Sequence, residues 1–362
     1  MCSWFKSVNN HPKAKDMFYR YSHSVSNSLV IERFQDMYQD LWYYRKLYNP
    51  DAREGVKGVQ MKFPAIFHEY TELINQKLLE VFEKDDPTMR DLTLYHIQAG
   101  GKRARPILSM LTCQGLGGML DDVMPYALTL EILHNVSLIY DDMIDGAHLR
   151  RGKNPLHVQF GIKNALIAAN YITWRALEIF SERVTPEALK ELALAVRMTS
   201  FGEKLDIDFS RLSEEDYMRV CENKTSYQFQ ISAFLGALAA TRDPDILEQS
   251  KQFGKNLGFA FQIRDDVLNI IGKEKESGKD VGTDYLRTRP NFVIVKAYQV
   301  MGDSLYEGEI LENIQSSGAL DEATTATEHY LEKTREFLSM FSVEKYRDML
   351  DMMIQFIIKR TL

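Results

Sequence analysis

The chain has few of the cysteines that a disulfide framework or a zinc site would need. Its 362 residues contain three cysteines, Cys2, Cys113 and Cys221, which are odd in number and far apart in the sequence. Neither a set of disulfide pairs nor the short cysteine spacing of a structural zinc site is present. A reducing compartment is therefore expected, and the cytoplasm is the simplest assignment.

Long apolar runs are also missing. No stretch of about 18 apolar residues lacks a charge, so the sequence pattern predicts no transmembrane segment. The first 29 residues have no apolar core typical of a secretory signal, although they carry four basic side chains against one acidic side chain. That balance leaves a weak organelle-targeting peptide open as an alternative to a cytoplasmic location.

Proline and glycine are scarce, with 10 and 20 residues respectively, and this scarcity favours long helices over many short strands. Apolar residues make up 45% of the chain and charged residues 26%, which is ordinary for a globular protein. The net charge of −7 argues against nucleic-acid binding, so clusters of Lys and Arg need a specific anionic ligand as their explanation.

Apolar side chains recur at helical spacing along most of the chain. This periodicity predicts an apolar helix from Phe292 and helices over residues 62–82, 87–99, 126–145, 163–183, 186–207, 217–240 and 250–271. The helix over 126–145 is apolar on all sides, which indicates a central position in a bundle. Residues 1–56 are expected to form an N-terminal extension, partly helical or disordered, ahead of one large domain over residues 57–362.

An acidic cluster, Asp141, Asp142 and Asp145, ends the helix predicted over 126–145, and the basic pair Arg150 and Arg151 follows at once. On a helix, Asp141 and Asp145 lie one turn apart on the same face, where they would repel each other without a cation. Mg²⁺ commonly binds one or two carboxylates together with substrate phosphates, and arginine forks grip phosphate oxygens. The pattern therefore predicts one half of a metal–diphosphate site.

A second acidic cluster, Asp265 and Asp266 with Asn269, lies in the apolar helix predicted over 250–271. Together with Gln262 it repeats the spacing of the first cluster, with asparagine in the last place. One such cluster alone is a weak signal, because acidic runs are common on solvated helix faces. Two clusters in matched contexts are much stronger, and the second supplies the missing half of the site.

Basic residues complete the pattern. The segment Gly-Gly-Lys-Arg-Ala-Arg-Pro (100–106) precedes a predicted helix and forms either an anion site or a solvated turn. His134 lies two turns before Asp141 on the same face, which leaves both a ligand and an ordinary core histidine open. Lys224, followed by Thr225, interrupts an apolar helix, where it either extends to solvent or holds an anion inside.

With these motifs in this order, the chain resembles the trans-isoprenyl diphosphate synthases of the farnesyl/geranylgeranyl type along roughly residues 62–358. The motifs are Gly-Gly-Lys-Arg-x-Arg-Pro (100–106), Glu-Ile-Leu-His (131–134), Asp-Asp-x-x-Asp with Leu-Arg-Arg-Gly-Lys (141–153), Lys-Thr (224–225), Phe-Gln-x-x-Asp-Asp-x-x-Asn (261–269) and Gly-Lys-Asp (278–280). The resemblance implies a polyprenyl synthase catalytic domain with an all-α fold, an isoprenoid-synthase-like helical bundle around a deep central cavity, usually as a homodimer. It implies a prenyltransferase that condenses an allylic diphosphate with isopentenyl diphosphate, using three Mg²⁺ ions between the acidic motifs.

The same resemblance implies a role for each matching residue. The metal ligands would be Asp141, Asp145 and Asp265, with Asp142, Asp266 and Asn269 close by. The allylic diphosphate would be held by Arg150, Lys224 and Lys279, with Arg289 where farnesyl-type enzymes often have lysine. Isopentenyl diphosphate would be held by Lys102, Arg105, His134 and Arg151. Thr225 and Gln262 would lie near the reacting carbons, and the departing pyrophosphate would serve as the base.

Product length in this family depends on residues just before the first acidic motif. Farnesyl-type enzymes place bulky aromatic residues four or five positions before it, where this chain has Ser137 and Val136. By that analogy the cavity floor is open beyond a farnesyl chain, and geranylgeranyl diphosphate is the expected product. Farnesyl diphosphate synthase remains an alternative, because side chains on neighbouring helices would also close the cavity.

Four positions depart from the pattern of many family members. Asn269 replaces an aspartate, Arg289 replaces a lysine, Glu203 stands near a position that is often glutamine, and Tyr140 replaces a frequent histidine. The first two keep open a terpene synthase, a lyase that ionises and cyclises a prenyl diphosphate on the same scaffold. A non-catalytic regulatory subunit is the third hypothesis, although such a subunit would be expected to lose one acidic motif.

Overall fold

The structure is a computed structural model that describes residues 67–209, 213–276 and 290–359. The chain divides into two compact units, Met1–Glu69 and Tyr70–Leu362. Of the first unit, residues 67–69 are described, and they include the start of helix α4 (His68–Phe82). The extension predicted over residues 1–56 lies outside the described residues, so its boundary stays a prediction.

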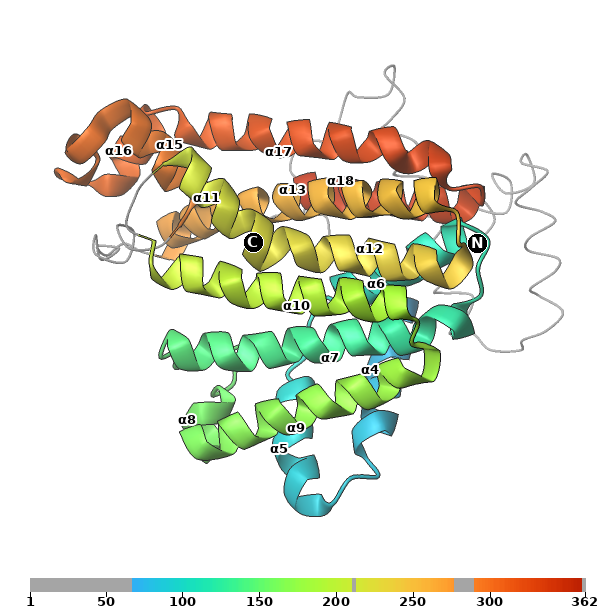
Figure 1. Ribbon diagram of the computed structural model, residues 1–362. Coiled ribbons are helices and arrows are strands. Elements are labelled where there is room, and N and C mark those ends of the chain that lie inside the picture. The colour runs from blue at the N-terminus through green and yellow to red at the C-terminus, as the bar shows by residue number, and fades with distance from the viewer. Residues whose placement is uncertain (1–66, 210–212, 277–289, 360–362) are drawn as a thin grey trace, which may run out of the picture. The chain divides into compact units, whose positions relative to one another are not determined.

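The second unit is a bundle of α-helices (Figure 1), which confirms the predicted all-α class. After α4 its α-helices are α5 (Pro87–Ile97), α6 (Ala104–Gly115), α7 (Leu120–Ile144), α8 (Leu156–Phe160), α9 (Ile162–Phe180), α10 (Pro186–Ile207), α11 (Glu214–Cys221), α12 (Tyr227–Ala240), α13 (Pro244–Glu276), α15 (Phe292–Met301), α16 (Ile310–Ser316), α17 (Ala319–Glu336) and α18 (Glu344–Lys359). Within the described ranges, the only β-type pairing is an isolated bridge between Arg150 and Lys153. No helix in those ranges is long and apolar enough to cross a membrane.

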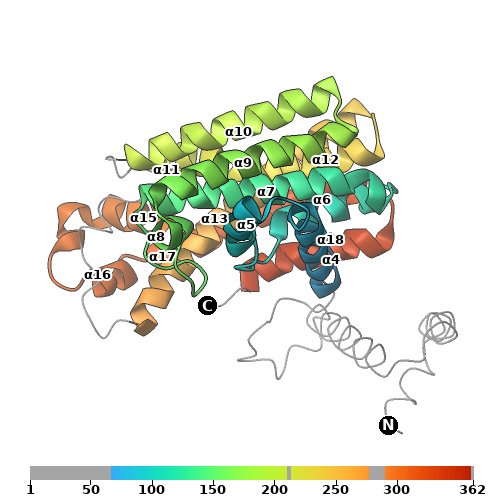
Figure 2. The same ribbon diagram turned by 90° about the horizontal axis from the view of Figure 1, so that it is seen from below.

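Helix α7 has the central position that its apolar sequence predicted, because it contacts α6, α9 and α12. Figure 2 shows α9 and α10 on one side of it. The core cluster around α7 includes small side chains from α9 that permit close helix packing: Ala165, Ala168, Ala169 and Ala176. Packing on several sides fixes the direction in which α7 carries its C-terminal carboxylates.

The start of α7 differs from the prediction. The helix begins at Leu120, six residues before the expected start, and includes Pro125. Pro125 lies beyond the first turn, where proline is best tolerated, so α7 continues through it without one of its backbone N–H hydrogen bonds. Asp121 and Asp122, expected in a solvated polar loop, instead occupy the first turn, where negative charge interacts favourably with the helix dipole. Asp122 also pairs with Arg183 at 2.9 Å, a partner that lies far away in the sequence.

The helix predicted over 217–240 is not continuous. A π-helical segment, η4 (Glu222–Ser226), separates α11 from α12 and contains both Lys224 and Thr225. Short π-helical segments inside helices are rare and often occur at functional sites. The interruption expected at Lys224 is therefore a change of helix type, and the chain bends between α11 and α12 (Figure 1).

Candidate active site

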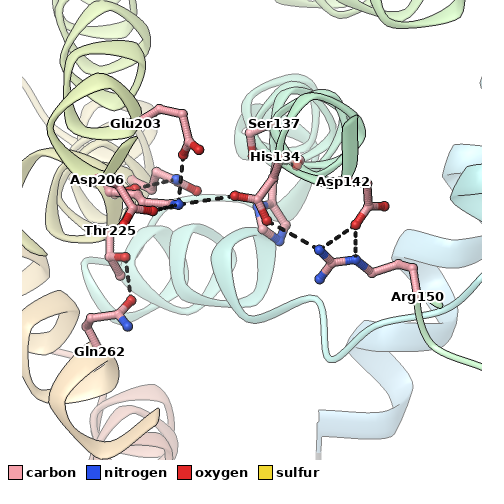
Figure 3. Close-up of polar contacts among 11 residues, drawn as sticks. His134, Ser137, Asp142, Arg150, Glu203, Asp206, Thr225 and Gln262 are labelled. Carbon is pink, nitrogen blue, oxygen red and sulfur yellow. Dashed lines mark hydrogen bonds and ion pairs between the residues drawn. The ribbon is translucent and has the colours of Figure 1, made fainter. Parts of the chain in front are cut away.

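Lys224 lies where η4, α7 and α10 meet. Its Nζ is 3.1 Å from Oδ1 of Asp141 on α7 and 2.8 Å from Oε2 of Glu203 on α10. It also donates a hydrogen bond to Asp206, one turn further along α10, and Figure 3 shows Glu203 and Asp206 converging on this contact. The π-helical segment thus brings one lysine against the first acidic motif and against two carboxylates that the sequence analysis did not assign to the site.

Charge at this contact is unbalanced. Burial alone would lower the pKa of Lys224, but Asp141, Asp206 and Glu203 outweigh burial and raise it, so the lysine stays protonated. Burial also raises the pKa of Glu203, and Lys224 offsets part of that rise. Three carboxylates around one ammonium group leave an excess of negative charge. Such an excess suits a divalent cation, which is often the largest local charge in a site.

Arg150 spans the first two carboxylates of α7 (Figure 3). Its Nε donates to Oδ1 of Asp142 at 2.7 Å, and its Nη2 donates to Oδ2 of Asp141 at 3.3 Å. The Asp142 side chain is 1% exposed. Its other carboxylate oxygen, Oδ2, has no hydrogen-bond partner among the described residues. Asp142 therefore positions Arg150 and leaves one buried acceptor available to a ligand.

Arg150 and Arg151 belong to one tight turn over residues 150–153, and their side chains have different partners. Backbone hydrogen bonds of 2.8 and 3.0 Å join Arg150 and Lys153 in both directions, and Arg151 and Gly152 have φ values of 51° and 76°. Positive φ at both central residues defines a type I′ turn, which is strained at an arginine. Nη1 of Arg151 donates to the carbonyl of Gly100. The turn therefore directs one arginine to the α7 carboxylates and the other to the basic loop.

The basic loop is shaped around Arg151. Gly101 has φ 144°, and a Cβ added there would lie 2.9 Å from Nη2 of Arg151, so a glycine is needed beside the guanidinium group. Lys102 is exposed and lies 5.4 Å from the centroid of the Phe356 ring. The loop thus holds a basic group close to its backbone, as expected of an anion-binding segment.

Arg105 and His134 lie together, with Nη1 of the arginine 3.3 Å from Nε2 of the histidine. Burial lowers the pKa of Arg105 to about 10. Burial and then the charge of Arg105 hold the pKa of His134 well below its usual value, so the histidine is neutral. Nε of Arg105 and Nδ1 of His134 are buried without a hydrogen-bond partner in the described part of the chain. An unsatisfied buried guanidinium group is chemically suited to an anionic ligand.

Sequence reasoning assigned no role to Arg103, although it lies in the same loop. Its Nη1 is 2.6 Å from Oε1 of Glu131, and both side chains are 2% exposed. It also donates to Oδ1 of Asn75 and to the carbonyl of Ile97, both at 2.9 Å. Arg103 therefore connects the basic loop to α4, α5 and α7. These contacts hold the backbone in place on either side of Arg103, where Lys102 and Arg105 lie.

The second acidic motif is connected to η4 by hydrogen bonds. Oγ1 of Thr225 donates to Oε1 of Gln262 at 2.7 Å, and Nε2 of Gln262 donates to Oδ1 of Asp266 at 3.0 Å. Oδ2 of Asp266 accepts from the backbone N–H of Phe292 at 2.8 Å. Asp266 is 3% exposed, and both of its oxygens have protein partners. In this arrangement Asp266 orients Gln262, while its neighbour Asp265 is only half-buried.

Burial raises the pKa of Asp266 to about 7 from an ordinary value of 3.8, even though the N–H of Phe292 and the Gln262 amide favour the ionised form. The folded state therefore holds this proton more tightly than the unfolded state. Its contribution to stability is fully present below about pH 4 and is lost as pH rises towards 7. We expect Asp266→Asn to remove this component, measured by urea unfolding in Mg²⁺-free buffer between about pH 4 and 7. Parallel pH curves for the two proteins would contradict the assignment.

The predicted metal ligands are all oxygen donors. Asp141 is half-buried on α7, Asp145 is exposed at the C-terminal end of that helix, and Asn269 is exposed on α13. Within the described ranges, no three acidic, histidine or cysteine side chains form a metal-binding cluster by themselves. Oxygen donors, excess negative charge and the free Oδ2 of Asp142 fit a hard cation that takes its remaining ligands from a substrate diphosphate. Lys279 and Arg289 lie outside the described residues, so their predicted roles stay predictions.

Comparison with known proteins places this geometry in a family. A family profile described as polyprenyl synthetase matches residues 86–330, more than half of the chain. The chain belongs to the polyprenyl synthetase family. This membership confirms the predicted resemblance and the predicted enzyme class, a prenyltransferase of the isoprenyl diphosphate synthase type.

Other polyprenyl synthetase relatives support the assignment. The geranylgeranyl diphosphate synthase of Methanosarcina mazei is 31% identical over 265 residues, which are 68% of this chain and 82% of that enzyme. The solved geranylgeranyl pyrophosphate synthetase of Pyrococcus horikoshii has a TM-score of 0.74 at 27% identity, with 82% of this chain and 98% of that chain covered. The polyprenyl synthase of Caulobacter crescentus, solved with calcium and isoprenyl diphosphate, has a TM-score of 0.74 at 28% identity, with 82% and 96% covered.

Proposed function

We propose that the protein condenses an allylic diphosphate with isopentenyl diphosphate and makes mainly geranylgeranyl diphosphate. One connected set of polar contacts carries this proposal. It runs from Arg150 through Asp141 to Lys224, and from the adjacent Thr225 through Gln262 to Asp266. The two acidic motifs are therefore joined by cationic and polar groups, which is the chemistry that ionisation of a diphosphate needs.

The first step breaks the allylic C–O bond, and the electron pair leaves with pyrophosphate. In this proposal Arg150 and Lys224 stabilise the leaving group as preorganised cations, with Lys279 and Arg289 adding charge. Three Mg²⁺ ions, held by Asp141, Asp145 and Asp265 with Asp142, Asp266 and Asn269 close by, supply further positive charge when bound. The carboxylates that contact Lys224 in the free protein keep it charged until a diphosphate replaces them.

The second step joins the two substrates. Arg105, His134 and Arg151, with Lys102, hold the diphosphate of isopentenyl diphosphate, and the buried unpaired Nε of Arg105 supports this assignment. The alkene attacks the allylic cation to form a C–C bond, and loss of a proton to pyrophosphate restores an alkene. Thr225 and Gln262, which are hydrogen-bonded to each other, are proposed to orient the reacting carbons.

One assay tests the reaction class. Purified protein is incubated with Mg²⁺ and dimethylallyl, geranyl or farnesyl diphosphate, with and without isopentenyl diphosphate, and products are extracted before and after phosphatase treatment. Longer prenyl alcohols should appear only after phosphatase and only with isopentenyl diphosphate, and EDTA should abolish them. Volatile terpenes formed without isopentenyl diphosphate would establish a lyase instead. Absence of turnover with every substrate would contradict a catalytic role.

Product length is proposed to depend on α7 just before its carboxylates. Ser137 is half-buried, shares a face with Asp141 one turn later, and donates to the carbonyl of His134 at 2.8 Å. Val136 is buried in the core cluster that contains the α9 alanines. We expect Ser137→Phe and Val136→Phe to shift the product from geranylgeranyl towards farnesyl diphosphate, measured by chromatography of the dephosphorylated alcohols. Ser137→Ala is the matched control, and an unchanged product in both phenylalanine variants would place the floor elsewhere.

We also propose a homodimer formed through α9 and α10, which lie on the same side of α7 (Figure 2). Large apolar side chains are exposed there, among them Ile162, Ile167, Trp174, Leu189, Val196 and Phe201. Trp174 alone is 65% exposed, and clustered exposed apolar groups of this size commonly mark an interface. Light scattering after size exclusion should give twice the chain mass for wild type and a smaller mass for Trp174→Asp. A monomeric wild type would exclude this assembly.

A further inference from the structure

Two glycines let neighbouring helices touch the backbone of η4. A Cβ added at Gly202 of α10 would lie 2.6 Å from the carbonyl carbon of Asn223 and closer still to the backbone nitrogen of Lys224. A Cβ added at Gly258 of α13 would lie 2.6 Å from Cα of Ser226. Both distances are far shorter than a carbon–carbon van der Waals contact. Only glycine fits at either position without moving the helix or η4.

The contact at Gly202 determines which carboxylates of α10 contact Lys224. Glu203 is the next residue on α10, and Asp206 follows four residues after the glycine, so the approach of the α10 backbone brings both carboxylates to the lysine Nζ. A wider separation between α10 and η4 would leave this ammonium group with Asp141 alone as its acidic partner. The position of Lys224 is therefore set by a backbone contact as well as by charge.

The contact at Gly258 acts on the opposite side of η4. There Oγ of Ser226 donates to the carbonyl of Lys255 at 2.7 Å, and Thr225 donates to Gln262. Gly258, Lys255 and Gln262 all belong to α13, the helix that carries the second acidic motif. A π-helical segment is rare and occurs mostly as a single turn inside an α-helix, so contacts from neighbouring helices are expected to help maintain it. These two glycines hold it between α10 and α13.

We infer that Gly202 and Gly258 are positioning residues for prenyl transfer, acting through Lys224 and Thr225 respectively. The inference rests on the proposed function of those two side chains. A methyl group at position 202 would move the lysine away from the allylic diphosphate and chiefly raise its KM. A methyl group at position 258 would move the Thr225–Gln262 pair relative to the reacting carbons and chiefly lower kcat, because small misplacements slow catalysis strongly.

The test compares Gly202→Ala and Gly258→Ala with two matched controls. A Cβ at Gly118 would lie 3.0 Å from Cα of Ala240, and a Cβ at Gly236 would lie 3.0 Å from Cα of Ser109, so Gly118→Ala and Gly236→Ala create backbone conflicts away from η4. All four variants should lower Tm. Gly202→Ala should raise KM for the allylic diphosphate at least about tenfold, with KM for isopentenyl diphosphate changed less than about twofold. Gly258→Ala should lower kcat by a similar factor, and the controls should change neither constant beyond about twofold.

A milder pair of variants covers the case in which a glycine variant does not fold. Ser226→Ala removes the hydrogen bond to the carbonyl of Lys255 and adds no volume, and it should lower kcat several-fold. Ser232→Ala removes a comparable buried hydrogen bond, to the carbonyl of Gln228 at 2.6 Å within α12, and should leave kcat unchanged. An active wild type whose η4 variants behave like their controls would overturn this inference alone. The proposed function is judged separately, by the activity of the wild type.

Discussion

Asp141→Asn is expected to lower kcat/KM at least about a thousandfold, which corresponds to about 4 kcal/mol of transition-state stabilisation. The carboxylate contacts Lys224 at 3.1 Å and Arg150 at 3.3 Å, and so connects the first acidic motif to both proposed diphosphate-binding cations. Asparagine keeps the size but removes the charge, and its amide would place a donor among cations. Steady-state kinetics at saturating Mg²⁺ measure the loss.

Asp208→Asn is the matched control for this substitution. Asp208 follows α10 and pairs with Lys204, and both side chains are more than half exposed. Exposed pairs of this kind contribute little to stability, so the control should keep wild-type kinetics and Tm. Comparable helical circular dichroism in both variants would show that any loss in Asp141→Asn is not unfolding. Near-normal turnover of Asp141→Asn would refute the proposed site.

Glu131→Ala is expected to lower the free energy of unfolding by about 3–5 kcal/mol, because it leaves the buried charge of Arg103 without its partner. The same substitution removes the hydrogen bond of 3.1 Å from Asn135 to the glutamate carboxylate. Loosening of the basic loop should also raise KM for isopentenyl diphosphate, because Lys102 and Arg105 flank Arg103. Urea unfolding at constant pH measures the first effect, and the midpoint should fall with little change in slope.

Two further variants show whether the loss comes from an unpaired buried charge. Glu80→Ala removes an exposed ion pair of 2.8 Å with Lys77 and should change stability by less than about 1 kcal/mol. The double variant Arg103→Met/Glu131→Leu replaces the buried pair with apolar side chains, and it should regain much of the stability lost in Glu131→Ala. A double variant as unstable as the single one would assign the loss to packing.

Much of the fold follows from signals that are local in the sequence. The helix predicted over 186–207 is observed as Pro186–Ile207, because Pro186 occupies its first turn and Thr185 accepts a hydrogen bond from the N–H of Ala188. The early start of α7 was missed because Pro125 suggests a boundary. The π-helical form of η4 was missed because it depends on backbone contacts from α10 and α13, which no local pattern records.

The candidate site was predictable in its residue types but not in its pairings. Charge and spacing singled out Asp141, Lys224 and the two arginines, because clustered charges of one sign require a ligand or side chain of opposite charge. Glu203 and Asp206 joined the site only through the contact of α10 with η4, although their spacing of three residues on one helix was a usable signal. Asp266 was predicted at the metal site. Its hydrogen bond from Gln262 forms within α13, whereas its bond from the N–H of Phe292 comes from folding α15 against α13.

The contact between Lys224 and Asp141 has a consequence for the order of binding. In the free protein this carboxylate already has an ammonium partner, so under the proposed mechanism a metal ion must displace the lysine before it binds well. A diphosphate that attracts Lys224 would leave the Asp141 carboxylate available to a metal, and a metal held by Asp141 would leave Lys224 available to the diphosphate. By thermodynamic reciprocity each ligand raises the affinity for the other by the same factor. Free Mg²⁺ alone would therefore load the resting enzyme poorly, and the enzyme would capture metal and prenyl diphosphate cooperatively.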